Sequence, residues 1–337
     1  MMADREFAEN DASRRLFLKG AISCAAAMLA SGTGCNHATE AASAPGPIPM
    51  RRLGRTGLEI TTFGLGGQAT IEMEDKREEA LRIVARALDL GVNYFDTAAG
   101  YRSGVSETQL GEGLAGRRSQ VILASKSRNR TRDGAWRDLE SSLKRLRTDR
   151  LDIWQVHNIK SVADVEQLFA KGGAIEAFQQ AREQKLTRFL GVTGHADPDL
   201  LIDCIHRFPF DTILLALNAA DKHYLSFGER LLPLCLERQM GIIAMKVPAR
   251  GRILWQPLTQ IPRLRRPGKL DMREAYHYVL SMPVSGAIIG CDTVEHLEEN
   301  VNLARTFKPF SVEQMLALEA KVKPIYEQAL YFRGREG

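Results

Sequence analysis

Apolar and polar positions alternate in two different ways along this chain from about residue 58 onward. Short apolar runs bounded by glycine or polar residues predict buried β-strands, whereas longer stretches with apolar residues three or four positions apart predict amphipathic helices. The stretch 76–89 has the helical spacing, with Ala80, Leu81, Val84 and Leu88 on one face. The predicted strands are Thr62–Leu65, Asn93–Asp96, Val121–Lys126, Ile153–Val156, Phe189–Thr193, Thr212–Leu217, Gly241–Met245 and Gly286–Ile289. The predicted helices are Lys76–Asp89, Trp136–Leu146, Ile175–Gln184, Pro198–His206, Glu229–Arg238, Met272–Ser281 and Val294–Arg305.

Strands and helices therefore alternate, which is typical of repeated βα units with a parallel sheet. Eight such strands over about 230 residues predict an α/β protein with a single-domain (β/α)8 barrel rather than a doubly wound sheet. A doubly wound dinucleotide-binding fold would need a G-x-G-x-x-G turn, and the nearest match, Gly64-Leu65-Gly66-Gly67, lacks the final spacing. The turn Gly54-Arg55-Thr56-Gly57 predicts a hairpin that closes the bottom of the barrel.

The N-terminal residues follow a different pattern, that of an export signal. Ser13-Arg14-Arg15-Leu16-Phe17-Leu18-Lys19 matches the twin-arginine pattern S-R-R-x-F-L-K, and the apolar stretch Ala21–Ala30 behind it is too short to form a stable transmembrane span. We therefore expect a twin-arginine signal peptide over 1–35, an Ala/Pro-rich linker over 36–49 and the barrel over 50–337.

This signal implies recognition by the twin-arginine export machinery and a periplasmic location. Two alternatives remain. Cys35 follows Gly34 and could be lipidated, although the position that a lipoprotein site fills with Leu is Gly32 here. If the signal is not used, the protein stays in the cytoplasm.

The composition mainly excludes other kinds of protein and site. Hydrophobic residues make up 44% and charged residues 26% of the 337 residues, as in ordinary globular proteins. The net charge of +5 is small and its cations are interspersed with acids, so no nucleic-acid partner is expected. The body keeps Cys204, Cys235 and Cys291, which imply no disulfide framework, and no metal-binding motif such as H-E-x-x-H is present, so no metal site is expected.

Candidate chemistry lies where the predicted strands end, because barrel enzymes carry their active sites at that face. Asp96, Lys126 and His157 each end an apolar strand, and Tyr101 follows Asp96 closely. Taken singly, Asp96 is explained as a helix cap, Lys126 as a solvated rim charge and His157 as a core histidine. Their arrival at one face, together with Tyr101, favours a catalytic function. A lysine cation beside the phenol would lower the tyrosine pKa from about 10 and prepare it for proton transfer. A neutral histidine would orient a carbonyl oxygen. No side chain supplies a hydride, so reduction requires a nicotinamide cofactor.

At these positions the sequence resembles the aldo-keto reductase family. The resemblance rests on Gly91-Val92-Asn93-Tyr94-Phe95-Asp96-Thr97-Ala98-Ala99-Gly100-Tyr101, Ser106-Glu107, Leu110-Gly111-Glu112, Leu123-Ala124-Ser125-Lys126, Leu151-Asp152-Ile153-Trp154-Gln155-Val156-His157, Gly191-Val192-Thr193 and His296-Leu297-Glu298-Glu299-Asn300. It implies the (β/α)8 barrel and NAD(P)H-dependent reduction of a small aldehyde or ketone, or the reverse reaction. It also implies a catalytic set of Asp96, Tyr101, Lys126 and His157, with Tyr101 as proton donor.

The resemblance implies a cofactor site that departs from the family pattern at several positions. Its implied residues are Thr193, Lys246, Gly290, Cys291, Glu299 and Asn300. Thr193-Gly194 replaces the usual Ser-Asn, Leu214 replaces a glutamine, Met245 replaces a stacking aromatic residue, and Gly290, Cys291 and His296 replace Lys, Ser and Arg around the 2′-phosphate. The choice between NADP and NAD therefore stays open. A second interpretation also stays open, in which the exported barrel is a binding or accessory module with weak turnover.

Overall fold

The computed structural model describes residues 46–255 and 267–333. The predicted signal peptide and linker residues 36–45 lie outside these ranges. The last linker residues pack on the body, because Ile48 is buried in the hydrophobic core and the Pro49 carbonyl accepts a hydrogen bond from Thr62 N at 2.9 Å.

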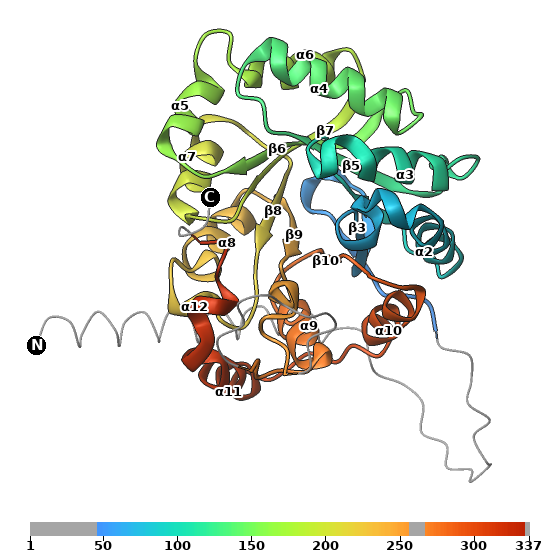
Figure 1. Cartoon of the computed structure of the whole chain (residues 1–337). Coiled ribbons are helices and arrows are strands. Elements are labelled where there is room, and N and C mark those ends of the chain that lie inside the picture. Colours follow the sequence, from blue (N-terminus) through green and yellow to red (C-terminus); the bar gives the residue numbers. More distant parts are fainter. Residues whose placement is uncertain (1–45, 256–266, 334–337) are drawn as a thin grey trace, which may run out of the picture.

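Eight parallel strands close into a barrel in the order β10-β3-β4-β5-β6-β7-β8-β9, as the sequence predicts (Figure 1). All eight predicted strands are present, with ends shifted by a few residues. Their bounds are β3 Phe63–Gly66, β4 Tyr94–Asp96, β5 Ile122–Ser127, β6 Leu151–Ile159, β7 Thr187–Gly194, β8 Thr212–Ala216, β9 Gly241–Met245 and β10 Gly286–Ile289.

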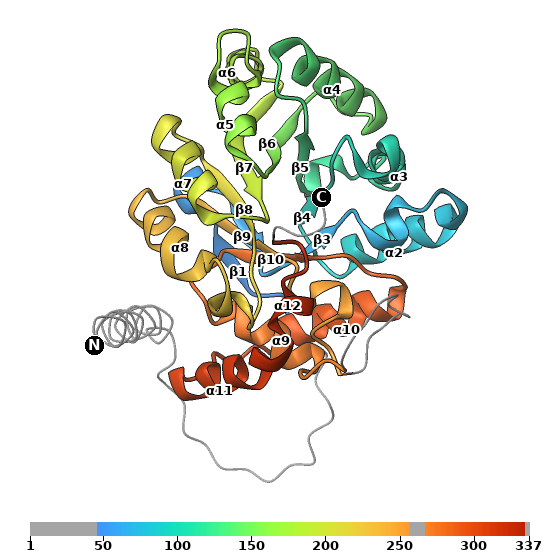
Figure 2. The same cartoon turned by 60° about the vertical axis from the view of Figure 1, so that its left-hand side comes forward.

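Helices surround the strands, with α4 and α6 on one side and α9, α10 and α11 on the other (Figure 2). Their bounds are α2 Arg77–Asp89, α3 Val105–Gly113, α4 Arg132–Arg145, α5 Val162–Phe169, α6 Ala174–Glu183, α7 Pro198–Arg207, α8 Phe227–Glu237, α9 Met272–Leu280, α10 Val294–Arg305, α11 Val312–Val322 and α12 Tyr326–Ala329. None of the described helices has the length and apolar character needed to cross a membrane.

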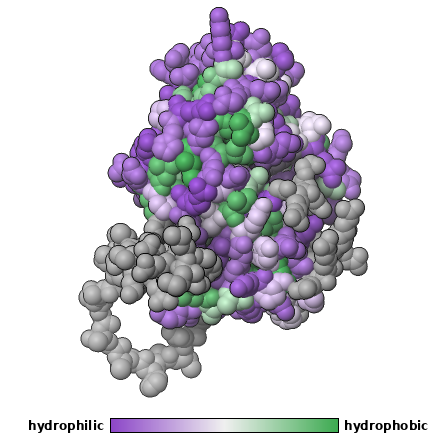
Figure 3. Space-filling model, turned by 90° about the vertical axis from the view of Figure 1, so that its left-hand side faces the viewer, coloured by the Kyte–Doolittle hydropathy of each residue, from purple (hydrophilic) through white to green (hydrophobic). Residues whose placement is uncertain are grey.

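Side chains along each strand alternate between the barrel interior and the layer of helices, as the period of two requires. Tyr94, Ala124 and Ile153 belong to the interior cluster, whereas Trp154 points outward and stacks on Phe178 of α6 with ring centroids 3.8 Å apart. On the outer surface, hydrophilic side chains cover most of the face shown in Figure 3, with small apolar patches between them. This alternation decides which strand residues can reach the barrel mouth.

The bottom of the barrel is closed by the predicted hairpin, formed by β1 (Met50–Arg52) and β2 (Glu59–Thr61). Leu53 and Ile60 of this hairpin are buried in the interior cluster. Gly54 has φ of +52°, and a Cβ there would lie 2.3 Å from Gly241 N, so the turn can approach β9 only with glycine at this position.

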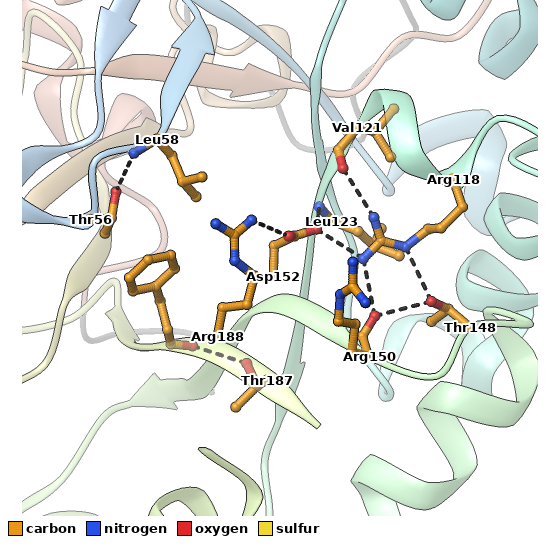
Figure 4. A network of polar contacts seen from close by, with 11 residues as sticks. Thr56, Leu58, Arg118, Val121, Leu123, Thr148, Arg150, Asp152, Thr187 and Arg188 are labelled. Carbon is orange, nitrogen blue, oxygen red and sulfur yellow. Dashed lines mark hydrogen bonds and ion pairs between the residues drawn. The ribbon is translucent and has the colours of Figure 1, made fainter. Parts of the chain in front are cut away.

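The buried Asp152 organises polar contacts at the same end of the barrel (Figure 4). Its carboxylate pairs with Arg118 and Arg188, each at 2.9 Å, and accepts the Leu123 backbone N–H at 3.0 Å. Because this end lies opposite the face where barrel enzymes carry their chemistry, the network is structural.

Candidate active site

Three neighbouring strands bring the predicted polar residues to one place through their register. Asp96 on β4 lies beside Ala124 on β5, and Lys126 on β5 lies beside Gln155 on β6. His157 is two positions beyond Gln155, so all four polar side chains occupy interior positions above the apolar interior cluster.

Lys126 is the centre of the contacts that follow. Its fully buried ammonium group pairs with the Asp96 carboxylate and donates to Thr97 O at 2.7 Å and to the Tyr101 hydroxyl oxygen at 3.3 Å. Gln155 Nε2 donates to the other carboxylate oxygen of Asp96 at 3.0 Å. The structure therefore joins a carboxylate, an ammonium and a phenol in one buried chain.

The Asp96 carboxylate and the Lys126 ammonium stabilise each other's charged forms. Burial lowers the pKa of Lys126, but Asp96 and Tyr101 raise it by more, so its pKa lies above the usual value and the ammonium is retained at neutral pH. Burial raises the pKa of Asp96, and Lys126 opposes that shift. The structure therefore pairs Lys126 with Asp96, and this pairing favours the protonated lysine that the sequence predicts.

The prediction for the tyrosine pKa is wrong in its net direction. Burial raises the pKa of Tyr101, and the opposing effect of Lys126 is smaller. The lysine acts with the predicted sign, but the sequence does not reveal how completely the phenol leaves water. The hydroxyl is therefore protonated at neutral pH, which suits a proton donor.

His157 packs against Tyr101, with ring centroids 5.6 Å apart and the planes nearly perpendicular. Burial, and then the charges of Lys126 and Arg128, lower the pKa of His157 well below its usual value. The ring is therefore neutral, as predicted, and its Nδ1 has no hydrogen-bond partner among the described residues.

The loop that carries Tyr101 is fixed by polar residues at the start of α3. Ser106 Oγ donates to Gly67 O at 2.6 Å and contacts Thr97 Oγ1 at 2.7 Å. A Cβ at Gly67 would lie 2.5 Å from Ser106 Oγ, so this close approach requires glycine. The neighbouring Glu107 is fully buried and binds Arg145 of α4. Ser106 and Glu107 therefore position the loop. Neither forms a hydrogen bond or ion pair with Tyr101, Lys126 or His157 in the described parts of the chain.

Two polar residues that sequence reasoning missed lie beside the predicted Thr193. Asn158 has φ of +56° and donates its backbone N–H to Thr193 Oγ1 at 2.8 Å, while its side-chain oxygen contacts His195 Nδ1 at 2.8 Å. Burial, and then the charge of Lys246, lower the pKa of His195 well below its usual value. The only signal in the sequence was that Asn158 directly follows a residue at a strand end.

Cations and open backbone lie at the end of β9 and β10. Lys246 has φ of +61° and donates through Nζ to Gln68 Oε1 at 3.2 Å, and burial lowers its pKa to about 8, with Arg250 adding to the shift. Gly290 is exposed, and a Cβ there would meet Gln68 O at 3.1 Å. The cations of Lys246 and Arg250, together with the exposed backbone at Gly290, fit the diphosphate of a dinucleotide.

The remaining predicted cofactor residues lie on α10 or just before it. Cys291 is buried, and burial raises its pKa to about 12, so the thiol is neutral and lies 3.7 Å from Asn300 Nδ2. Asn300 is almost fully buried, whereas Glu299 is exposed. His296 is half-buried, and its Nδ1 has no partner within the described parts of the chain.

The sequence also matches a known family model, that of the aldo/keto reductase family, over residues 62–256, which is more than half of the chain. The chain therefore belongs to the aldo/keto reductase family and is an oxidoreductase of that class. It is similar to the L-galactose dehydrogenase of Arabidopsis thaliana, with 26% identity over 314 residues that cover 82% of this chain and 95% of the relative.

Solved structures agree with this fold. The holo form of the aldo-keto reductase AKR11C1 from Bacillus halodurans superposes with a TM-score of 0.68 at 24% identity, covering 81% of this chain and 96% of that chain. An aldo-keto reductase from Klebsiella pneumoniae in complex with NADPH gives a TM-score of 0.64 at 20% identity, covering 85% and 96%. At this level of identity both likenesses establish the barrel fold.

Proposed function

We propose that this protein reduces an aldehyde or ketone to an alcohol, or catalyses the reverse reaction, with NAD(P)H as the second substrate and Tyr101 as proton donor. The observation that carries this proposal is the buried chain from Asp96 through Lys126 to the Tyr101 hydroxyl, with neutral His157 against the phenol ring. When bound, the nicotinamide supplies the hydride, which no side chain at the barrel mouth can supply.

Each of the four residues has one task in this reaction. Tyr101 gives its proton to the carbonyl oxygen as negative charge develops there, and the Lys126 ammonium at 3.3 Å stabilises the phenolate that remains. Asp96 keeps Lys126 charged and in place. His157, being neutral, orients the carbonyl oxygen through a hydrogen bond.

The cofactor would lie across the mouth with its diphosphate near Lys246 and Gly290. The Klebsiella pneumoniae relative that binds NADPH has the same fold, which supports this placement. Asn158 and His195 supply polar atoms beside Thr193 for the nicotinamide amide. No arginine or lysine replaces the family's cations in the stretch Gly290–His296, so we expect similar Kd values for NADPH and NADH.

Tyr101→Phe tests the proposal, because it removes the proton donor and leaves the ring. Turnover of a good carbonyl substrate, followed as the loss of NADPH absorbance, should fall by about 10²–10⁴-fold. The Kd for NADPH, measured by fluorescence titration, should stay close to that of the unchanged protein. Wild-type turnover in this variant would show that the four residues are wrongly assigned.

A second function is favoured by the residues where the family has nicotinamide contacts. Leu214 and Met245 are buried in the apolar interior cluster and offer neither an amide nor an aromatic ring to the cofactor. The barrel would then be a binding or accessory module with weak turnover. Tight NADPH binding together with negligible turnover of every carbonyl compound would support this alternative.

A further inference from the structure

One cation at the barrel mouth has no task in the proposed reaction. Arg128 follows β5 and is exposed, and a side chain built at Gly100 would meet its Cδ, Nε and Cζ atoms at 3.7 to 3.8 Å. Gly100 directly precedes Tyr101, so the guanidinium lies against the loop that carries the proton donor. Its charge also contributes to the lowered pKa of His157 on the neighbouring strand.

The guanidinium of Arg128 has no hydrogen bond or ion pair among the described residues, in contrast to its neighbour Arg130. Arg130 pairs with Asp164 at 3.0 Å and donates to His157 O at 2.9 Å. The acidic groups whose charges reach Tyr101 are Asp96, which is bound to Lys126, and Glu72. Neither of them pairs with Arg128.

The backbone on both sides of Arg128 is nevertheless held firmly. Arg130 Nη1 donates to the Arg128 carbonyl at 3.1 Å. Ser127 Oγ and Asn129 Nδ2 both donate to Asp138 of α4, at 2.6 and 2.8 Å. A fixed loop therefore presents an unpaired guanidinium, and less conformational entropy is lost when an anion binds it.

Arg128 lies too far from Lys246 and Gly290 to bind the same cofactor phosphates. In the closed strand order, β5 lies four strands from β9 in either direction, so the two ends face each other across the barrel. Arg128 lies on the side of Tyr101 and His157, where the carbonyl group of the substrate must be placed.

We propose that Arg128 binds an anionic group of the substrate, so that the enzyme acts on carbonyl compounds that also carry a carboxylate or a phosphate. This inference rests on the proposed function. A guanidinium binds either anion through two parallel hydrogen bonds, and the two classes are separated by the choice of substrates.

Two matched substrate pairs test the inference. Succinic semialdehyde is compared with butanal, and glyceraldehyde 3-phosphate with glyceraldehyde, by their kcat/KM values with NADPH. We expect one anionic member to be favoured over its neutral partner in the unchanged protein. Arg128→Gln should reduce that preference by about tenfold or more, mainly through KM, because the anion is bound in the ground state as well.

The controls keep the charge or remove it elsewhere. Arg128→Lys should retain part of the preference, and Arg137→Gln, which removes an exposed cation on the outer helix α4, should retain all of it. A preference that is absent, or that is unchanged in Arg128→Gln, would overturn this inference while leaving Tyr101-dependent turnover intact. If none of the four compounds is reduced, the proposed function fails and this inference fails with it.

Discussion

Lys246 shows how burial can make one residue sensitive to pH in the working range. Its Nζ donates to Gln68 Oε1 at 3.2 Å. Burial first, and then the charges of Arg250 and Lys126, lower its pKa to about 8, and the charges of Glu72 and Asp96 oppose this shift. The group is therefore a cation below about pH 8 and loses its charge as the pH rises through that value. A bound diphosphate is favoured by the charged form only.

We predict that the Kd for NADPH rises about five- to tenfold between pH 7 and pH 9, since one proton is lost from a group with a pKa near 8. Fluorescence titration at the two pH values measures this change. Lys246→Gln should bind more weakly at pH 7 and lose the pH dependence, while Lys308→Gln, at an exposed site, should keep it. A pH-independent Kd in the unchanged protein would remove Lys246 from the phosphate site.

Some residues of the site could be predicted from the sequence because strand geometry alone places them. Asp96, Lys126 and His157 end apolar runs, so parallel packing has to bring them to one face. The raised pKa of Tyr101 could not be predicted, because it depends on how deeply the loop buries the phenol. Asn158 has a left-handed backbone and donates its N–H to Thr193 Oγ1, a contact between β6 and β7 that no local sequence pattern predicts.

The chain after α12 packs against the end of β8 and the loop that follows it. Arg333 is buried, pairs with Asp221 in the loop after β8, and donates to Ala216 O at 3.1 Å. The preceding Phe332 lies against His195, with ring centroids 6.1 Å apart. This contact places an aromatic side chain at the mouth, next to the polar residues of β7.

Arg333→Gln should leave the Asp221 carboxylate buried without its cation, at a cost of about 3–5 kcal/mol. We predict a fall in Tm of about 5–8 °C and a higher KM for the carbonyl substrate. The control Arg230→Gln breaks an exposed pair with Asp199 and should change Tm little. Equal Tm values for both variants and the unchanged protein, measured by calorimetry, would contradict this role of Arg333.

The strands and the helices differ in how clearly the sequence pattern predicts them. The eight strands are short, apolar and bounded by turn residues, so their positions could be predicted closely. The helix α3 was not predicted because Val105–Gly113 contains two glycines and few apolar residues. It is held by tertiary contacts such as Glu107 with Arg145, which act only when the barrel is assembled.

For the molecule as a whole, we propose that the folded barrel is exported through the twin-arginine route. This proposal rests on Ser13–Lys19, which lies outside the described residues, and on the apolar stretch behind it. Export of a folded barrel would let the protein carry its cofactor out of the cytoplasm. Lipidation at Cys35 and retention in the cytoplasm are the other outcomes.

Replacing Arg14 and Arg15 with lysine should retain the protein in the cytoplasm, whereas the unchanged chain should reach the periplasm. Immunoblots of cell fractions measure the distribution. Equal cytoplasmic amounts of both forms would contradict export. Recovery of the exported form with the membrane, and its release by Cys35→Ser, would identify a lipid anchor.

In the proposed reaction a hydride passes to a carbonyl carbon at the mouth of this barrel while Tyr101 protonates the oxygen. Reduction of a carbonyl substrate with NADPH deuterated at C4, on one face and then on the other, tests this hydride transfer. We predict that mass spectrometry finds one deuterium on the carbinol carbon from one labelled face only, with product formation reduced at least about 100-fold in Tyr101→Phe. An alcohol without deuterium from either face, or equal product from Tyr101→Phe, would contradict this reaction.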